Sequence, residues 1–109
     1  MNHTPSWKQF IADIWFKDNI PNLEDFAKLI INKLDLHVVD KYTYKFNPWK
    51  TIVYVLSESH FIIHTYPEHK YIWVDIYTCW NQNPYNAEKI IRENFSIKKL
   101  NVSKLKRWI

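Results

Sequence analysis

Hydrophobic and polar residues alternate along several short stretches of this chain, which is the pattern of a β-strand with one buried face. The stretches are 10–16, 42–46, 51–56, 60–66 and 71–79, with a shorter one at 100–102. We interpret residues 51–66 as a strand that is interrupted around Glu58. A turn is predicted at Asn47-Pro48, where the alternation of the preceding stretch ends.

Two other stretches carry apolar residues at the spacing of an amphipathic helix. Asn22 can cap the first helix, whose inner face is formed by Leu23, Phe26, Ala27, Ile30 and Leu34. Asn83-Pro84 predicts the cap and first residue of the second helix, whose inner face carries Ala87, Ile90 and Ile91. The order of strand, helix, several strands, helix and strand predicts an α+β two-layer sandwich, with the helices on one face of an antiparallel sheet. We expect residues 1–109 to form one domain.

The chain contains no glycine and a single cysteine. A glycine-dependent phosphate loop is therefore excluded, and turns that need a positive φ must use Asn or Asp. Asn47, Asn81 and Asn83 stand where turns are expected. One cysteine excludes internal disulfides and suits a reducing compartment. Because there is also no apolar run of membrane-spanning length and no apolar signal region, we expect a cytoplasmic protein without a membrane partner.

The net charge of +4 makes nucleic acid a candidate partner. The excess of positive charge lies mainly in the C-terminal KKLNVSKLKRWI. We interpret that stretch as a solvated basic tail. The central part of the chain is polar without being basic, which disfavours a surface that follows a phosphate backbone. No nucleic-acid partner is expected.

The segment LSESHFIIHTYPEH, residues 56–69, places carboxylates, imidazoles and hydroxyls on an otherwise apolar strand. Such groups are costly there unless they are paired or used. In a regular strand His64 would share a face with Glu58, and Ser59 would point the other way. Cooperation between Ser59 and His64 therefore requires a bend or a break near the Glu58-Ser59 bond, and a cut there would free Ser59 to move toward His64.

The run SESHFIIHTYPE followed by VDIYTC resembles the signature of the prokaryotic S-adenosylmethionine decarboxylases. The resemblance implies a proenzyme that cuts itself between Glu58 and Ser59, giving a β chain of residues 1–58 and an α chain of residues 59–109. It implies that the Ser59 hydroxyl attacks the Glu58 carbonyl and that His64 helps to remove the Ser59 α-proton. Elimination and hydrolysis then leave a pyruvoyl group as the cofactor. Thr51 falls where the family carries a serine that assists processing.

The same resemblance implies that the pyruvoyl ketone forms a Schiff base with the substrate amine and acts as an electron sink when carbon dioxide leaves. It makes Cys79 the acid that reprotonates the substrate α-carbon. For substrate binding, Tyr66 or Phe46 can stack on adenine, and Glu58 can accept hydrogen bonds from ribose hydroxyls. Glu68 is another matched position of the signature. The implied product is the aminopropyl donor for spermidine, and the implied assembly is a homodimer with two active sites.

The chain departs from the family where Trp80 and Lys70 replace glycine and where NPWKT replaces a glycine-containing turn. Because Trp80 would reshape the pocket, a related pyruvoyl decarboxylase of a free amino acid (arginine or ornithine) stays open, as does an uncleaved non-catalytic homologue. A metal site is not expected, since the spacing of His60, His64, His69 and Cys79 matches no compact zinc pattern.

Overall fold

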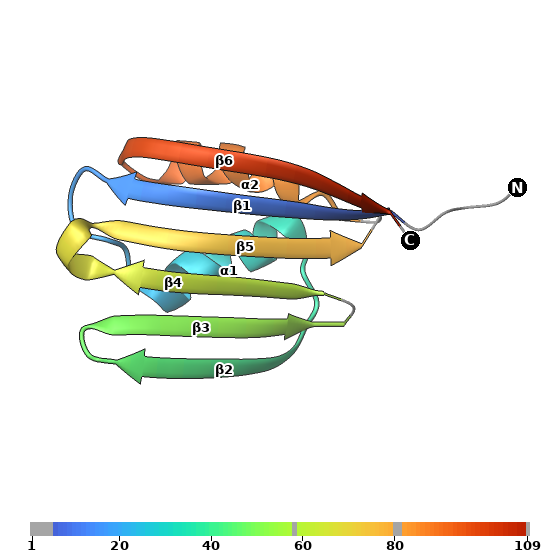
Figure 1. Cartoon of the computed structure of the whole chain (residues 1–109), viewed down its shortest axis with the longest axis horizontal. Coiled ribbons are helices and arrows are strands. Elements are labelled where there is room, and N and C mark those ends of the chain that lie inside the picture. The colour runs from blue at the N-terminus through green and yellow to red at the C-terminus, as the bar shows by residue number, and fades with distance from the viewer. Residues whose placement is uncertain (1–5, 58, 80–81, 109) are drawn as a thin grey trace, which may run out of the picture.

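The computed structural model is a six-stranded antiparallel sheet with the strand order β2-β3-β4-β5-β1-β6 (Figure 1). It describes residues 6–57, 59–79 and 82–108. The strands are β1 (Ser6–Phe16), β2 (Val38–Phe46), β3 (Trp49–Leu56), β4 (His60–Tyr66), β5 (Tyr71–Cys79) and β6 (Ile97–Trp108). The helices are α1 (Leu23–Leu34) and α2 (Ala87–Asn94), with 3-10 turns at Pro67–His69 and Pro84–Asn86.

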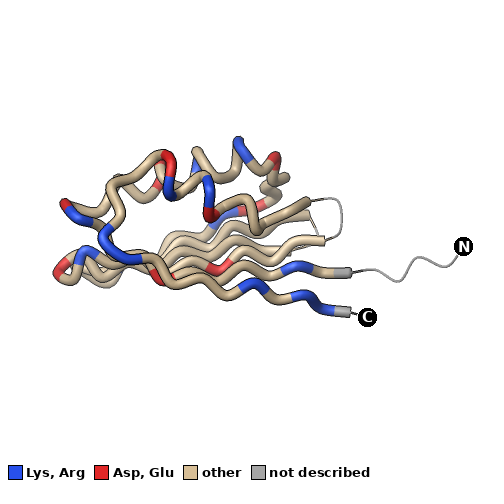
Figure 2. The backbone as a smooth tube through the Cα atoms, turned by 90° about the horizontal axis from the view of Figure 1, so that it is seen from above, with Lys and Arg blue, Asp and Glu red and all other residues tan. Residues whose placement is uncertain are grey.

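Both α-helices lie on the same side of the sheet, as the edge-on view shows (Figure 2). Asn22 caps α1 as predicted, because its side-chain oxygen accepts a hydrogen bond from the Asp25 amide at 3.0 Å. Asn83 accepts a hydrogen bond from the Tyr85 amide, but the turn that it begins is 3-10 and α2 starts only at Ala87. The predicted α+β sandwich with helices on one face is confirmed.

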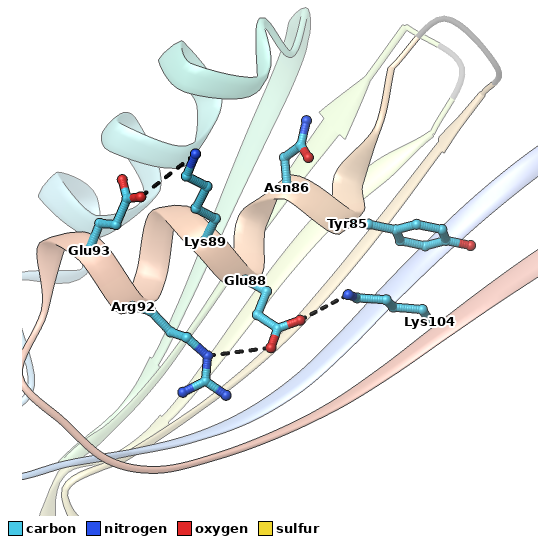
Figure 3. A pocket seen from close by; sticks show the side chains of 7 residues that line it. All are labelled: Tyr85, Asn86, Glu88, Lys89, Arg92, Glu93 and Lys104. Carbon is cyan, nitrogen blue, oxygen red and sulfur yellow. Dashed lines mark hydrogen bonds and ion pairs between the residues drawn. The ribbon is translucent and has the colours of Figure 1, made fainter.

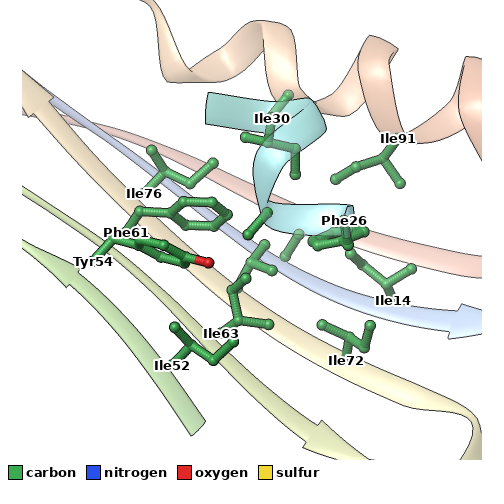
Figure 4. Close-up of a cluster of buried hydrophobic side chains, with 14 of the residues drawn as sticks. Ile14, Phe26, Ile30, Ile52, Tyr54, Phe61, Ile63, Ile72, Ile76 and Ile91 are labelled. Atoms are coloured by element: carbon green, nitrogen blue, oxygen red, sulfur yellow. The ribbon is translucent and has the colours of Figure 1, made fainter. Parts of the chain in front are cut away.

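The core lies between the helices and the inner face of the sheet (Figure 4). Strand alternation supplies the sheet side of this core, since every second residue of each central strand is buried. Phe26, Ile30 and Ile91 supply the helix side and are completely buried. The opposite face of the sheet carries no helix, and we call it the open face. It consists of the odd-numbered residues of β1, β3 and β5, the even-numbered residues of β2 from Asp40 onward and of β4, and the odd-numbered residues 99–107 of β6.

The interpretation of residues 51–66 as one interrupted strand is wrong. β3 and β4 are neighbouring antiparallel strands, in which Thr51 pairs with His64 and Val55 with His60. The Leu56 amide donates to the Ser59 carbonyl at 3.0 Å, and only three residues separate the two strands. The chain reversal carries no Gly, Asn or Pro signal, and alternation alone does not distinguish a hairpin from a long strand.

The basic C-terminal stretch is not a solvated tail. It forms the edge strand β6, which pairs with β1 along nearly its whole length. Its lysines and arginine are exposed. They are spread along this edge strand (Figure 2). Lysines on an edge strand discourage pairing with further chains, so this charge has a structural explanation.

Two non-glycine residues of the described chain have a positive φ, Asp35 at 55° and Lys70 at 53°. Asp35 ends α1 and fits the expectation that Asp or Asn would take such positions. Asn47 and Asn83 do not have a positive φ, and Asn81 lies outside the described residues. Lys70 stands in the tight connection before β5, at a position where glycine is free of the Cβ clash.

Replacing Lys70 by Gly is therefore expected to stabilise the fold by about 0.5–1 kcal/mol, because relief of the left-handed conformation outweighs the entropy of the unfolded glycine. Urea unfolding of the two proteins measures the difference. Lys33→Gly in the last turn of α1 is the control, and it should destabilise by about 1 kcal/mol because glycine is a poor helix former. A loss of stability in Lys70→Gly would contradict the strain at this position.

Candidate active site

Thr51 and His64 meet on the open face, directly opposite each other on β3 and β4. Thr51 Oγ1 lies 2.8 Å from His64 Nδ1, which is hydrogen-bonding distance. The imidazole is partly buried, and this burial lowers the pKa of His64. A histidine in this state is neutral near pH 7 and can accept a proton. The structure thus places His64, the base that the resemblance implies for processing, beside Thr51, the hydroxyl that it implies as an assisting group.

The same end of the sheet holds an aromatic pocket of about 190 Å³. It is lined by Tyr44, Phe46, Trp49, Thr51, His64, Thr65 and Tyr66. The rings of Phe46 and Trp49 are stacked, with centroids 5.8 Å apart and planes 11° apart, and Tyr66 lies 6.1 Å from Trp49. Phe46 and Tyr66 are therefore brought together with His64. Flat, partly exposed rings beside hydrogen-bonding groups suit a planar heterocyclic ligand.

Trp49 is a pocket residue that the sequence interpretation missed. Its indole Nε1 donates to Glu68 Oε1 at 2.9 Å and to Oε2 at 3.2 Å. Glu68 lies in the exposed 3-10 turn after β4, so its carboxylate borders the pocket and holds Trp49 in place. The pairing of Phe46 with Trp49 across the predicted turn at Asn47-Pro48 was the available signal.

Ser59 and Cys79 lie at the other end of the sheet. Ser59 is half-buried in the connection between β3 and β4, immediately before the first residue of β4. Cys79 is the last residue of β5, and it follows Tyr77, which pairs with His60. By strand alternation Cys79 belongs to the open face. Glu58 and Trp80 lie outside the described residues.

Within one chain the structure does not bring Ser59 and His64 together. The chain bends at Ser57 and Ser59, as the sequence required, but a regular strand follows. Five residues of extended strand separate the two side chains, which corresponds to about 16 Å at about 3.3 Å per residue. Ser59 would remain tethered to β4 after a cut, so the expectation that it could move to its own His64 is wrong.

The structure has two further hollows, and neither of them connects the His64 end of the open face with the Ser59 end. One, of about 470 Å³, is lined by Trp15, Tyr66, His69 and Tyr71, and so shares Tyr66 with the aromatic pocket. The other, of about 400 Å³, lies between α2 and β6 (Figure 3). Its charges are paired among themselves, with Glu88 contacting Lys104 at 2.9 Å and Arg92 at 3.3 Å. Because α2 is on the helical side of the sheet, this hollow is separate from the candidate site.

The family model for S-adenosylmethionine decarboxylase matches residues 10–108. An S-adenosylmethionine decarboxylase proenzyme of Clostridium kluyveri is 34% identical over 109 residues, covering 94% of this chain and 86% of the relative. One of Clostridium botulinum is 34% identical over 97 residues, covering 83% and 82%. A crystal structure of the adenosylmethionine decarboxylase from Aquifex aeolicus matches with a TM-score of 0.75 and 28% identity, covering 94% of this chain and 91% of that one.

The fold and the motif-bearing strands thus define an α+β protein of the decarboxylase proenzyme type. The chain belongs to the S-adenosylmethionine decarboxylase family. Among residues 6–57, 59–79 and 82–108, no helix is long and apolar enough to cross a membrane. Within the same ranges, no three His, Cys, Asp or Glu side chains gather at metal-binding distance.

Proposed function

We propose that this chain is a proenzyme that cuts itself at Glu58-Ser59 and then decarboxylates S-adenosylmethionine to the aminopropyl donor for spermidine. Family membership supports the reaction. The single observation on this chain that carries the proposal is the Thr51–His64 contact on the open face, because it provides a neutral base with an oriented ring. A neutral imidazole is required for a base that removes a proton near pH 7.

Processing begins when Ser59 Oγ attacks the Glu58 carbonyl, so that the amide becomes an ester and the proton of the hydroxyl passes to the released amine. His64 then removes the Ser59 α-proton, and elimination expels residues 1–58 with Glu58 as a carboxylate. The dehydroalanine that remains takes up water and releases ammonia, which leaves the pyruvoyl group on residues 59–109. Thr51 contributes by holding His64 Nδ1, which fixes the direction of the ring.

The observed surroundings of Ser59 fit such a group. Its position at the start of β4 leaves a new chain end on the sheet, beside the end of β5 that carries Cys79. When formed, the pyruvoyl group supplies a ketone that draws electrons from the substrate as its carboxylate leaves. Cys79 then delivers a proton to the substrate α-carbon, a role that suits a half-buried thiol close to the new chain end.

The aromatic pocket is the proposed site of the nucleoside. Phe46 and Tyr66 offer ring faces for adenine, and Glu68 keeps Trp49 in the pocket wall. Glu58, as the last residue of the β chain, is proposed to accept hydrogen bonds from the ribose. The stacked rings of Phe46 and Trp49, with centroids 5.8 Å apart, are exposed on the surface. A base can therefore lie against them without any change in the core.

The working enzyme is proposed to be a homodimer in which each active site uses both chains. Ser59 and Cys79 lie at one end of the open face, whereas His64, Thr51 and the aromatic pocket lie at the other. If two open faces pack with their strands reversed, the Ser59 end of each chain meets the His64 end of its partner. One contact then completes two sites.

The open face also has the composition of an interface. Tyr42, Tyr44, Phe46 and Tyr66 on its β2–β4 side are between 44% and 67% exposed, which is high for large aromatic side chains. Exposed apolar surfaces of this kind mark association sites, and aromatic residues are enriched in them. Covering this face would also exclude water from the aromatic pocket.

Tyr66→Ala tests the substrate pocket. We expect normal self-cleavage and a KM for S-adenosylmethionine raised about 10-fold, because base stacking on an aromatic ring contributes about 1–3 kcal/mol. Release of carbon dioxide from labelled S-adenosylmethionine measures turnover, and mass spectrometry measures cleavage. Tyr42→Ala, in the same proposed interface but outside the pocket, is the matched control, because it separates loss of the pocket ring from weakened association. An unchanged KM in Tyr66→Ala would refute the stacking role, and preferential release from arginine or ornithine would refute the substrate.

A further inference from the structure

A line of polar side chains crosses the open face close to Ser59 and has no part in the processing scheme above. Arg107 Nη1 on β6 lies 3.5 Å from Gln9 Oε1 on β1. Gln9 Nε2 donates to Asp75 Oδ1 at 3.0 Å and to Oδ2 at 3.2 Å on β5. Asp75 Oδ2 lies 3.3 Å from His60 Nε2 on β4. The line thus runs over four adjacent strands and ends at the residue bonded to Ser59.

Asp75 is unusual because its side chain is only 12% exposed, although it lies on the face without helices. Burial acts to raise the pKa of Asp75, but the contacts with His60 and Gln9 outweigh it, so the pKa lies below the ordinary value of a carboxyl. The group is therefore a buried carboxylate that needs donors around it. Gln9 donates to both carboxylate oxygens, and His60 Nε2 faces Oδ2.

His60 needs a hydrogen-bond partner, as Asp75 needs a donor. Its Nε2 atom is buried and forms no well-aligned hydrogen bond with the residues that the structure describes. Within that part of the chain, Asp75 is the carboxylate in ion-pair range of this atom. The ring also lies against Tyr77, with centroids 5.6 Å apart, so its plane is confined. A small rotation of the ring would pair the nitrogen with the carboxylate.

The order of donors along this line fixes the state of His60. Because Arg107 has only donors, Gln9 turns its oxygen toward Arg107 and its NH₂ group toward Asp75. The carboxylate of Asp75 only accepts, so a neutral His60 ring that pairs with it through Nε2 carries its proton on that atom. The other ring nitrogen, Nδ1, is then available to accept a hydrogen bond on the Ser59 side of the ring.

We propose that Asp75 is a positioning residue for processing, which holds His60 as the Nε2–H tautomer and so fixes the backbone that presents Ser59. The inference rests on the proposed cleavage at Glu58-Ser59. His60 supplies the amide to which the pyruvoyl group stays attached, so rotation of its side chain and displacement of the start of β4 change the direction of Ser59. Attack by Ser59 depends on that direction.

The tautomer is tested by NMR on ¹⁵N-histidine-labelled full-length chain carrying Ser59→Ala, at a pH at which the ring is neutral. The His60 signal is identified by its loss in His60→Gln. We expect Nε2–H with Asp75 and the reversed tautomer, Nδ1–H, with Asp75→Asn. The asparagine must turn its one oxygen to the Gln9 donor, and its NH₂ group then faces His60. The Nδ1–H form with Asp75 present, or the same tautomer in both chains, would overturn the proposal.

The effect on processing is tested in chains that retain Ser59. Asp75→Asn should slow the appearance of residues 59–109 about 10-fold or more, since misplacement by about 1 Å can cost about 100-fold. The matched control is Asp13→Asn, which removes another carboxylate of this face that accepts a hydrogen bond, from Tyr71, and should cleave at the normal rate. Equal rates in Asp75→Asn and the unmodified chain would overturn the positioning role.

The two proposals fail in different ways. If the unmodified chain stays whole, the proposed cleavage is wrong and the tautomer measurement alone decides whether Asp75 orients His60. If the unmodified chain is cut and Asp75→Asn is cut equally fast, the proposed function stands and only the role of Asp75 is refuted.

Discussion

Replacing His64 by Ala is expected to leave the chain almost entirely uncleaved. The substitution removes the proposed base for the Ser59 α-proton, and a positioned acid or base contributes about 10²–10⁴-fold to a rate. Thr51 would lose its partner at 2.8 Å, but the core would be untouched because His64 lies on the open face. The half-time of conversion, followed by mass spectrometry, measures the effect. Cleavage at the normal rate would exclude His64 from processing.

The His64→Ala chain also reveals whether the two parts of the site come from different chains. In a mixed dimer with Ser59→Ala, the intact Ser59 of one chain would face the intact His64 of the other. We therefore expect co-expression to restore cleavage of the His64→Ala chain, distinguished by a tag, while the Ser59→Ala chain stays whole. A partner with both substitutions is the control and should restore nothing. Absence of rescue in a confirmed mixed dimer would contradict the shared site.

Replacing Cys79 by Ala is expected to have the opposite outcome, with normal self-cleavage and turnover reduced by about 10²–10⁴-fold. The thiol is proposed to act only after the pyruvoyl group exists, as the acid that protonates the substrate α-carbon. Carbon dioxide release and formation of the aminopropyl product are measured together. Full turnover by Cys79→Ala would refute its role as the acid.

Thr78→Ser is a suitable control for the Cys79 substitution. Thr78 is the fully buried neighbour of Cys79 on the opposite face of β5, so it tests disturbance of the strand end without touching the open face. We expect Thr78→Ser to retain both cleavage and turnover. A similar loss of turnover in both chains would show that Cys79→Ala acts through the local fold.

The sequence was sufficient to predict the strands and helices in which buried residues recur at a regular spacing. The alternation of β1 and β5 and the helical spacing of α1 each report one buried face, and Asn22 marks a helix start through a local hydrogen bond. The pairing of β3 with β4 was not predicted because register depends on contacts across strands. A last strand was predicted from Leu100 and Val102, but its length was not, because the lysines around this short alternation made the rest of the stretch look like a solvated tail.

For the site, the family resemblance identified residues that the structure then placed at two ends of one face. Strand parity correctly indicated that Ser59 and His64 do not cooperate within a regular strand. Parity concerns only the face on which a side chain lies, so it did not address the five residues of strand that separate Ser59 from His64. Trp49 and Asp75 were missed because their partners, Glu68 and His60, are brought close only by the fold.

Mass spectrometry of the purified, unmodified protein tests self-cleavage most directly. We predict two chains, residues 1–58 ending in Glu58 and residues 59–109 beginning with a pyruvoyl group, the latter lighter by one ammonia than a chain that begins with serine. The Ser59→Ala chain, measured alongside, should stay whole. A single species of 13.4 kDa from the unmodified protein would contradict the proposal that Ser59 is the precursor of the cofactor.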